Sequence, residues 1–338
     1  MKKYLNIVLN FIVFPATAIL LLYLAFLGID LKDIWEKILS VNFYWVYVSL
    51  LFALGGIYFR ALRWRLLLES VNHKPPVSTT IYAVILAYFA NMAIPRIGEV
   101  TRCATLKKTN QIPLDISFGT VITERIIDFI TLLFFIVLVL ILDFSFFSSF
   151  FKENVLHTLS QKFSSSSLYL FTLFLIVFVV IALLFIFKTR LQHFIIIQKT
   201  KDFIKGMVNG LLSVIKLQKK WLFLFYTVLI WTCYVLMTYV VFFAIDSTSH
   251  LSLTDSMFVM SIGGLGMSAP VQNGFGAFHW IVSRGLMLYG ISQADGLLYA
   301  TLCHESQALM ILLLGPVVLF LIMLYIKRKT VTFKSYGL

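Results

Sequence analysis

Apolar blocks about as long as a membrane-crossing helix, which needs about 20 residues, fill most of the sequence and constrain its fold. The chain has 338 residues, of which 60% are hydrophobic and only 13% are charged. A soluble domain carries about 25% charged residues. Strand-like alternation of apolar and polar residues is absent. The blocks therefore predict an all-α polytopic membrane protein and not a β-barrel.

Residues 1–338 are expected to form a single integral membrane domain with six full spans and two broken helices. The broken stretches, residues 78–94 and 253–269, end at Pro95 and Pro270 and continue through a glycine-containing turn into a more polar helix. Prolines interrupt helices because they lack the backbone N–H. The full spans are expected near residues 6–27, 43–62, 115–142, 168–187, 221–245 and 296–326.

Loop charges predict the orientation, because cytoplasmic loops carry an excess of Lys and Arg. We expect residues 188–220 to form a cytoplasmic basic segment, in which 199–217 has the pattern of an amphipathic helix on an anionic leaflet. The protein is expected in a bacterial cytoplasmic (inner) membrane, with both termini on the cytoplasmic side. Arg60, Arg63 and Arg65 follow the second span and are interpreted as an interfacial anchor, with lipid phosphate as the alternative partner.

The net charge of +13 would suggest nucleic acid as a partner of a soluble chain. Here the cations lie mostly between apolar blocks, so orientation and anionic lipid explain them, and nucleic acid is not expected. Cys103, Cys233 and Cys303 are far apart and lack metal-ligand spacing. Neither a disulfide, a metal nor a cofactor is therefore predicted.

The loop charges agree with the number of spans only if neither broken stretch crosses the membrane. Each must then enter the membrane, turn near the midplane and return to its own side. The first hairpin, about 78–110, would then open to the cytoplasm and the second, about 253–292, to the exterior. The halves 43–142 and 221–326 share the order span, broken hairpin and long span, and they enter from opposite faces. We therefore expect two re-entrant hairpins in an inverted repeat, which is the pattern of alternating-access transporters.

Two groups of charged residues lie in the first half, on the returning arm of the hairpin and in the next span. Within each group, spacings of three or four residues place side chains on one helix face. A charge at the bilayer centre costs about 2.5–3.5 kcal/mol, so these groups must pair or meet a polar cavity or ligand. We interpret them as an anion-binding cluster, or alternatively as ion pairs that fasten the hairpin to the span. The residues are Arg96, Glu99, Arg102, Glu124, Arg125 and Asp128.

The second half supplies neutral polar groups and a His–Glu pair. These residues are interpreted as further substrate contacts, although the amides could instead cap the helix ends of their own hairpin. Glu305 is the best candidate for a titrating group, and a lone His–Glu pair is too sparse to predict a metal site. The candidates are Gln272, Asn273, His279, Arg284, His304 and Glu305.

The chain resembles the lysylphosphatidylglycerol synthase transmembrane, or flippase-like, family at residues 95–102 (PRIGEVTR) and 124–128 (ERIID). These stand-alone proteins are similar to the membrane half of the bacterial multiple peptide resistance factor. The resemblance covers nearly the whole chain and implies lipid translocation. Bifunctional members flip aminoacylated phosphatidylglycerol outward, and related proteins act in polyprenol-linked glycan pathways. Because the sequence ends at Leu338, we expect the soluble aminoacyltransferase domain of those members to be missing and do not carry over their synthase activity.

The resemblance differs between the two halves. The family commonly has a Pro-Gly-Gly turn followed by Glu, whereas this chain has Pro270, then residues 273–276 (NGFG), with His279 near the Glu position. Second-half ligands therefore do not follow from the resemblance. In the first half the motif match covers Arg96, Gly98, Glu99, Arg102, Glu124, Arg125 and Asp128.

The sequence predicts a lipid flippase or transporter that binds an anionic lipid or lipid-linked headgroup in a polar cavity between the hairpins. The expected partner is a membrane phospholipid or a polyprenyl-linked lipid, and homo-oligomerisation is left open. Two alternatives remain, a non-transporting scaffold or accessory subunit and a membrane-embedded enzyme that acts on lipid phosphates. No catalytic residue is assigned.

Overall fold

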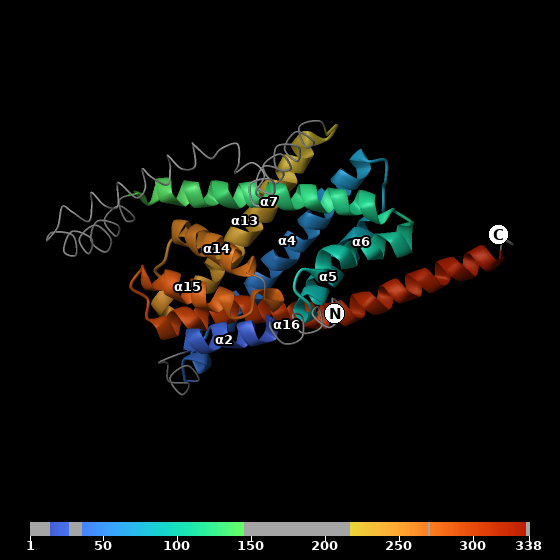
Figure 1. Ribbon diagram of the computed structural model, residues 1–338. Helices are drawn as coiled ribbons and strands as arrows, with labels where there is room; N and C mark the ends of the chain where they lie inside the picture. The colour runs from blue at the N-terminus through green and yellow to red at the C-terminus, as the bar shows by residue number, and fades with distance from the viewer. Residues whose placement is uncertain (1–13, 27–35, 145–216, 270, 336–338) are drawn as a thin grey trace, which may run out of the picture. The chain divides into compact units, whose positions relative to one another are not determined.

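The computed structural model describes residues 14–26, 36–144, 217–269 and 271–335 (Figure 1). Over these ranges the chain is helical and contains no strand. The expected span at 168–187 lies outside the described residues, as do Pro270 and all but the last four residues of the basic segment. Of the expected first span, helix α2 is described, Phe14–Phe26.

The chain divides into two compact units, one of Met1–Arg125 with Val214–Leu338 and the other of Ile126–Ser213. Four described helices are long and apolar enough to cross a membrane: α4, α7, α13 and residues Gln293–Lys327 of α16. They correspond to four of the six expected spans. The helices after α2 are α4 (Phe43–Ser70), α5 (Val77–Ala93), α6 (Ile97–Asn110), α7 (Leu114–Leu142), α13 (Lys220–Phe242), α14 (Leu253–Met267), α15 (Ala277–Met287) and α16 (Gln293–Ser335), with 3₁₀ turns η3 (Asp246–Thr248) and η4 (Gln272–Gly274).

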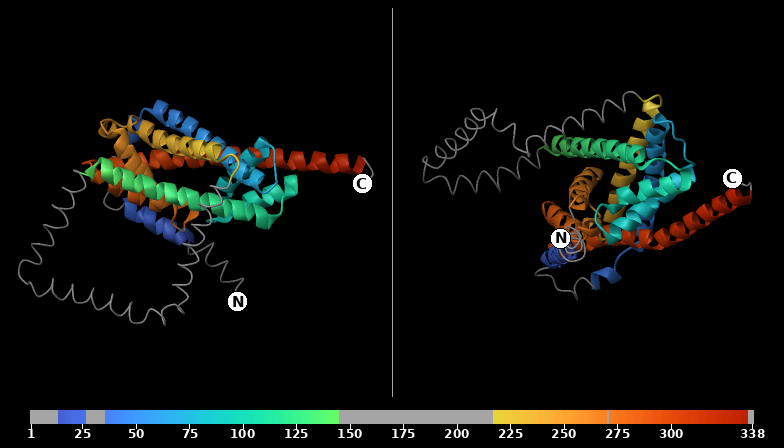
Figure 2. Two further views of the ribbon diagram at one scale, coloured as in Figure 1. Left: turned by 90° about the horizontal axis from the view of Figure 1, so that it is seen from above. Right: turned by 45° about the vertical axis from the view of Figure 1, so that its right-hand side comes forward.

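Each half contains a helix–turn–helix hairpin between two long helices, as the sequence predicts. The arms of the first hairpin, α5 and α6, lie side by side in each view (Figure 1 and Figure 2). The junction between hairpin and final helix is alike in both halves. A left-handed residue, Gln111 (φ 57°) or Gly290 (φ 78°), precedes a buried isoleucine, Ile112 or Ile291. The order of elements is therefore repeated, and the inversion across the membrane stays a prediction.

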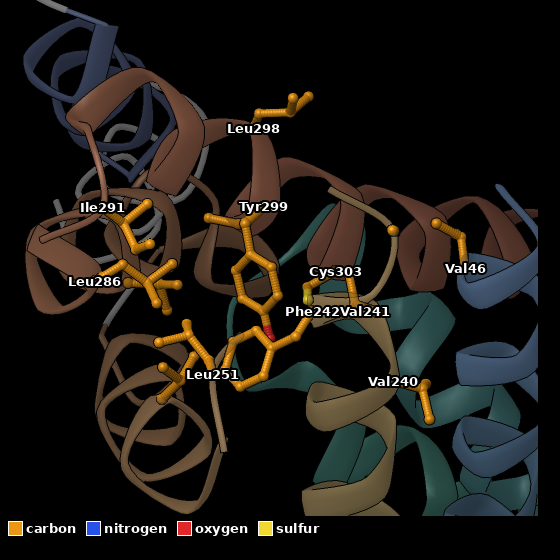
Figure 3. Packing of buried hydrophobic residues seen from close by; sticks show 14 of the residues in the cluster. Val46, Val240, Val241, Phe242, Leu251, Leu286, Ile291, Leu298, Tyr299 and Cys303 are labelled. Carbon is orange, nitrogen blue, oxygen red and sulfur yellow. The ribbon is translucent and has the colours of Figure 1, made fainter. Parts of the chain in front are cut away.

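One apolar core joins α13, α14, α15 and α16 to the start of α4 (Figure 3). At its centre Tyr299 of α16 is fully buried and packs on Phe242 of α13, with 5.1 Å between ring centroids. The Tyr299 hydroxyl donates to the Thr238 carbonyl oxygen at 2.7 Å, so its polar end is satisfied. This core fixes α16 against α13.

The last helix also contacts the first hairpin. Apolar residues of α16, among them Ile311 and Val318, pack in a second core with α4, α5 and α6. A Cβ at Gly315 would overlap the Phe89 ring of α5, so glycine permits this close approach. Helix α16 therefore lies against both the first hairpin and α15 of the second.

Candidate functional site

A buried carboxylate lies among three arginines in the first half. Arg102 of α6 donates to Oε2 of Glu124 in α7. Arg60 Nε and Arg63 Nη2 of α4 each lie 3.5 Å from Glu124 Oε1. The four side chains are at most 7% exposed. Because they come from three helices, these ion pairs hold α4, α6 and the start of α7 together.

The same arginines reach two further helices. Arg60 Nη1 donates to the Tyr88 hydroxyl of α5 at 2.9 Å. Arg63 Nη1 donates to the Thr227 hydroxyl of α13 at 3.4 Å. Hydrogen bonds to charged groups are worth more than neutral ones, about 1.5–3 kcal/mol each. The buried network therefore connects five helices around Glu124.

Trp64 completes this network. It is fully buried, and the guanidinium carbon of Arg102 lies 4.0 Å from the centroid of its ring. Its indole N–H donates to the Thr120 hydroxyl at 2.9 Å. A desolvated cation–π contact contributes about 2 kcal/mol. Arg102 therefore contacts both the Trp64 ring and the Glu124 carboxylate.

The interpretation of Arg60 and Arg63 as an interfacial anchor is wrong, because both are buried. Helix α4 continues to Ser70 and does not end near residue 62, so these arginines lie inside it. Arg65 is 32% exposed and pairs with Glu69 at 3.3 Å. The sequence signal for burial was the spacing of Arg60 and Arg63 at i, i+3, which places them on one face of the helix.

A second ion pair between α6 and α7 is partly accessible. Arg125 Nη2 lies 3.2 Å from Glu99 Oε1, and the two side chains are 43% and 23% exposed. Ion pairs therefore do join the hairpin to the span, which was the alternative interpretation of the cluster. Asp128 is half-buried and belongs to the other compact unit.

The tip of the first hairpin reaches the second hairpin. Arg96 adopts a left-handed backbone (φ 62°) where α6 begins, and its Nη2 donates to the Ser268 carbonyl oxygen at the end of α14, at 3.1 Å. The Gly98 N–H donates to Asn91 Oδ1 at 2.7 Å, which satisfies one free amide of the helix start. Helix α5 also contacts η4. The turns of the two hairpins are therefore in contact.

We expect Gly98→Ala to lower the free energy of unfolding by about 1–3 kcal/mol, the usual effect of overpacking. A Cβ at Gly98 would overlap the Ala87 carbonyl oxygen and lie 2.7 Å from Asn91 Oδ1. The matched control is Gly119→Ala, whose Cβ would meet nothing within 4 Å. Thermal unfolding of the purified variants in detergent measures the effect. Equal melting temperatures for the two variants would contradict the expectation.

The second half brings four candidate residues together. Glu305 Oε1 of α16 lies 2.7 Å from His304 Nδ1 and 3.3 Å from His279 Nε2 of α15. His304 Nε2 lies 2.8 Å from the Asn273 carbonyl oxygen in η4. The neighbouring Gln272 is half-buried. The side chain of Arg284 stays apart, because it is exposed and contacts Met287 of its own helix.

The positive-φ residues of the second turn follow the sequence expectation for a tight bend. Gly274 and Gly276 have φ values of 72° and 77°, and Asn273 has 48°. Such values favour glycine and are tolerated by asparagine. A Cβ at Gly274 would also meet the Met267 sulfur at 2.6 Å. This bend places the Asn273 carbonyl against His304.

Comparison with known proteins identifies the family. The lysylphosphatidylglycerol synthase TM region matches residues 7–315. A UPF0104 membrane protein of Methanocaldococcus jannaschii is 24% identical over 124 residues, which make up 36% of this chain and 36% of that protein. No solved structure matches the chain. With its long apolar helices and a match over most of its length, the chain is a multi-pass membrane protein that belongs to the family of the lysylphosphatidylglycerol synthase transmembrane region.

Proposed function

We propose that this protein moves anionic lipids or lipid-linked headgroups between the leaflets of a bacterial inner membrane. The supporting observation is the contact between Arg96 and Ser268, which links the tips of the two hairpins at 3.1 Å. In transporters built from inverted repeats, the substrate lies between the repeats, where broken helices meet. A headgroup that passes between the tips would replace the Ser268 carbonyl as the partner of Arg96.

Two arginines are accessible enough to bind a phosphate. Arg96 is exposed at the helix start, and Arg125 keeps 43% of its side chain exposed beside Glu99. Guanidinium groups bind phosphate oxygens in bidentate geometry, and a helix start adds free N–H groups. Arg102 is instead buried against Glu124. We therefore assign headgroup binding to Arg96 and Arg125 and a supporting role to the Glu124 network.

The proposal treats both hairpins as re-entrant. Their arms have 17, 14, 15 and 11 residues, whereas a full crossing needs about 20. A turn at membrane depth is tolerated where protein satisfies its backbone. The bond from Gly98 to Asn91 does this in the first turn. The loop charges favour a cytoplasmic position for both termini.

Leaflet exchange in liposomes tests the proposal. Purified protein is reconstituted with fluorescent phosphatidylglycerol, and dithionite bleaching reports how much lipid reaches the outer leaflet. We expect exchange with the wild type, and at least tenfold slower exchange for Arg96→Gln and Arg125→Gln, because a charged hydrogen bond contributes about 1.5–3 kcal/mol. Phosphatidylethanolamine and a polyprenyl phosphate in parallel samples identify the headgroup class.

Arg284→Gln is the matched control, since Arg284 is also exposed but contacts its own helix. Its exchange rate should equal that of the wild type. Folding of each variant is checked by size-exclusion chromatography and thermal unfolding. Background exchange with folded wild-type protein across the whole lipid panel would exclude the proposal and favour a scaffold role. Equal losses for all three arginine variants would exclude the assignment of Arg96 and Arg125.

A further inference from the structure

We infer that the second half binds a divalent transition metal of the zinc class through His279, His304 and Glu305. One ligand atom from each residue lies within 4.8 Å of the others. Two imidazoles with one carboxylate form a recognised zinc ligand set. His279 comes from the returning arm of the hairpin, and the other two come from α16. A bound ion would therefore join the hairpin directly to the last helix.

The two ring nitrogens of His304 face a backbone carbonyl and a carboxylate. Its Nε2 faces the Asn273 carbonyl oxygen at 2.8 Å, and a carbonyl can only accept, so Nε2 carries the proton. Nδ1 lies 2.7 Å from Glu305 Oε1, so a second proton on the ring or a cation bound by both atoms would satisfy this contact. Ligating histidines typically donate their other N–H to a carbonyl in this way.

The convergence of three ligand atoms also suits a single divalent ion. His279 Nε2 also points at Glu305 Oε1, from 3.3 Å, so two imidazoles converge on one oxygen. The carboxylate oxygen can accept one N–H from each ring, whereas a divalent ion would replace these protons and bind all three atoms together. In tetrahedral zinc sites, bond lengths of about 2.0–2.1 Å separate neighbouring ligand atoms by about 3.3–3.4 Å. The His279–Glu305 distance has this value, and the 2.7 Å between His304 Nδ1 and Glu305 Oε1 would lengthen by about 0.6 Å when an ion binds.

The surroundings suit a buried metal site with one open position. The imidazoles of His279 and His304 are 2% and 4% exposed, and Phe275 and Phe278 lie 5.5 Å and 5.4 Å from the His304 ring. An apolar shell limits water access and strengthens ligation. Glu305 is 38% exposed, so a water or a substrate oxygen could complete the coordination from that side. The expected complex has three protein ligands and one exchangeable ligand.

Metal binding is tested on the full-length protein, purified without a polyhistidine tag and stripped with a chelator. We expect one Co²⁺ per chain with the intense visible absorption of tetrahedral cobalt, and displacement by Zn²⁺. Glu305→Gln and His304→Gln should lose this absorption and weaken binding at least tenfold. His250→Gln is the control, because His250 is exposed in the loop before α14. It should bind like the wild type.

Thermal unfolding gives a second readout. Zn²⁺ should raise the melting temperature of the wild type and of His250→Gln but not that of Glu305→Gln. Glu305→Gln keeps the shape of a partly exposed side chain, so it carries the test if His304→Gln does not fold. Equal metal retention by Glu305→Gln, or no tetrahedral spectrum with the wild type, would overturn the inference. Lipid exchange enters neither readout, so this result and the transport result stand separately.

Discussion

Glu124→Gln is expected to destabilise the folded protein by about 3–5 kcal/mol, the usual effect of removing one partner from a buried ion pair. Glu124 is fully buried, and three guanidinium groups from α4 and α6 contact its carboxylate. The amide keeps the shape but removes the negative charge that compensates them. Unfolding of the purified variant in detergent, followed by circular dichroism against temperature, measures the loss.

Asp115→Asn is the matched control, because Asp115 is an exposed acid in the first turn of the same helix. Its loss should stay below about 1 kcal/mol, the size of a helix-dipole contribution. The double variant Glu124→Gln with Arg102→Gln should be less destabilised than the sum of the single variants, because residues in contact are coupled. Equal stability of Glu124→Gln and Asp115→Asn would show that the carboxylate does not hold these helices.

The bounds of both hairpins could be predicted from the sequence because proline and glycine mark the breaks between their arms. The expected first hairpin, about 78–110, corresponds to α5 and α6, which together span 77–110. The second, about 253–292, corresponds to α14 and α15, which span 253–287. Proline and glycine interrupt helices through the backbone itself, so their effect is visible without a tertiary structure. Membrane depth has no such local signal, so re-entry stays a prediction.

The composition of the first charged cluster was only partly predictable. Spacing grouped the charged residues of α6 on one helix face and those of α7 on another, but it did not assign pairs between them. The pairs that form are Arg102 with Glu124 and Arg125 with Glu99. Loop-charge counting assigned Arg60 to a cytoplasmic loop, because this method does not consider which partner each cation has. Its burial depends on Glu124, far along the chain, and on how the helices pack. Local patterns therefore identified charged faces but not the division between buried and accessible groups.

The His–Glu pair illustrates the same limit in the second half. His304 and Glu305 are adjacent in sequence, and on their own they are too few to bind a metal. The third group, His279, belongs to another helix and joins them through the packing of α15 on α16. The Asn273 carbonyl that fixes the His304 ring comes from the turn between the hairpin arms. Every residue has a backbone carbonyl, so the sequence gives no signal for a hydrogen bond of this kind.

Covalently joining the two hairpin tips is expected to reduce lipid exchange to background. The pair Ala93→Cys and Ser268→Cys places one thiol at the end of α5 and one at the end of α14, where Arg96 already connects the turns. Arg96 donates to the backbone carbonyl of Ser268, so that contact survives both substitutions. Alternating access requires the repeats to move against one another, and a flexible bis-maleimide prevents the tips from parting. Liposome exchange before and after cross-linking measures the effect.

Three controls separate locking from chemical damage. Each single cysteine variant treated with the reagent, and the pair treated with a monofunctional maleimide, should keep the exchange rate of the untreated protein. The native Cys103, Cys233 and Cys303 are buried, so the reagent reaches the introduced thiols first. A cleavable cross-linker should restore exchange when it is cut. Undiminished exchange by protein that mass spectrometry shows to be fully cross-linked would mean that the headgroup does not pass between the tips, because a fixed contact there would not obstruct its path.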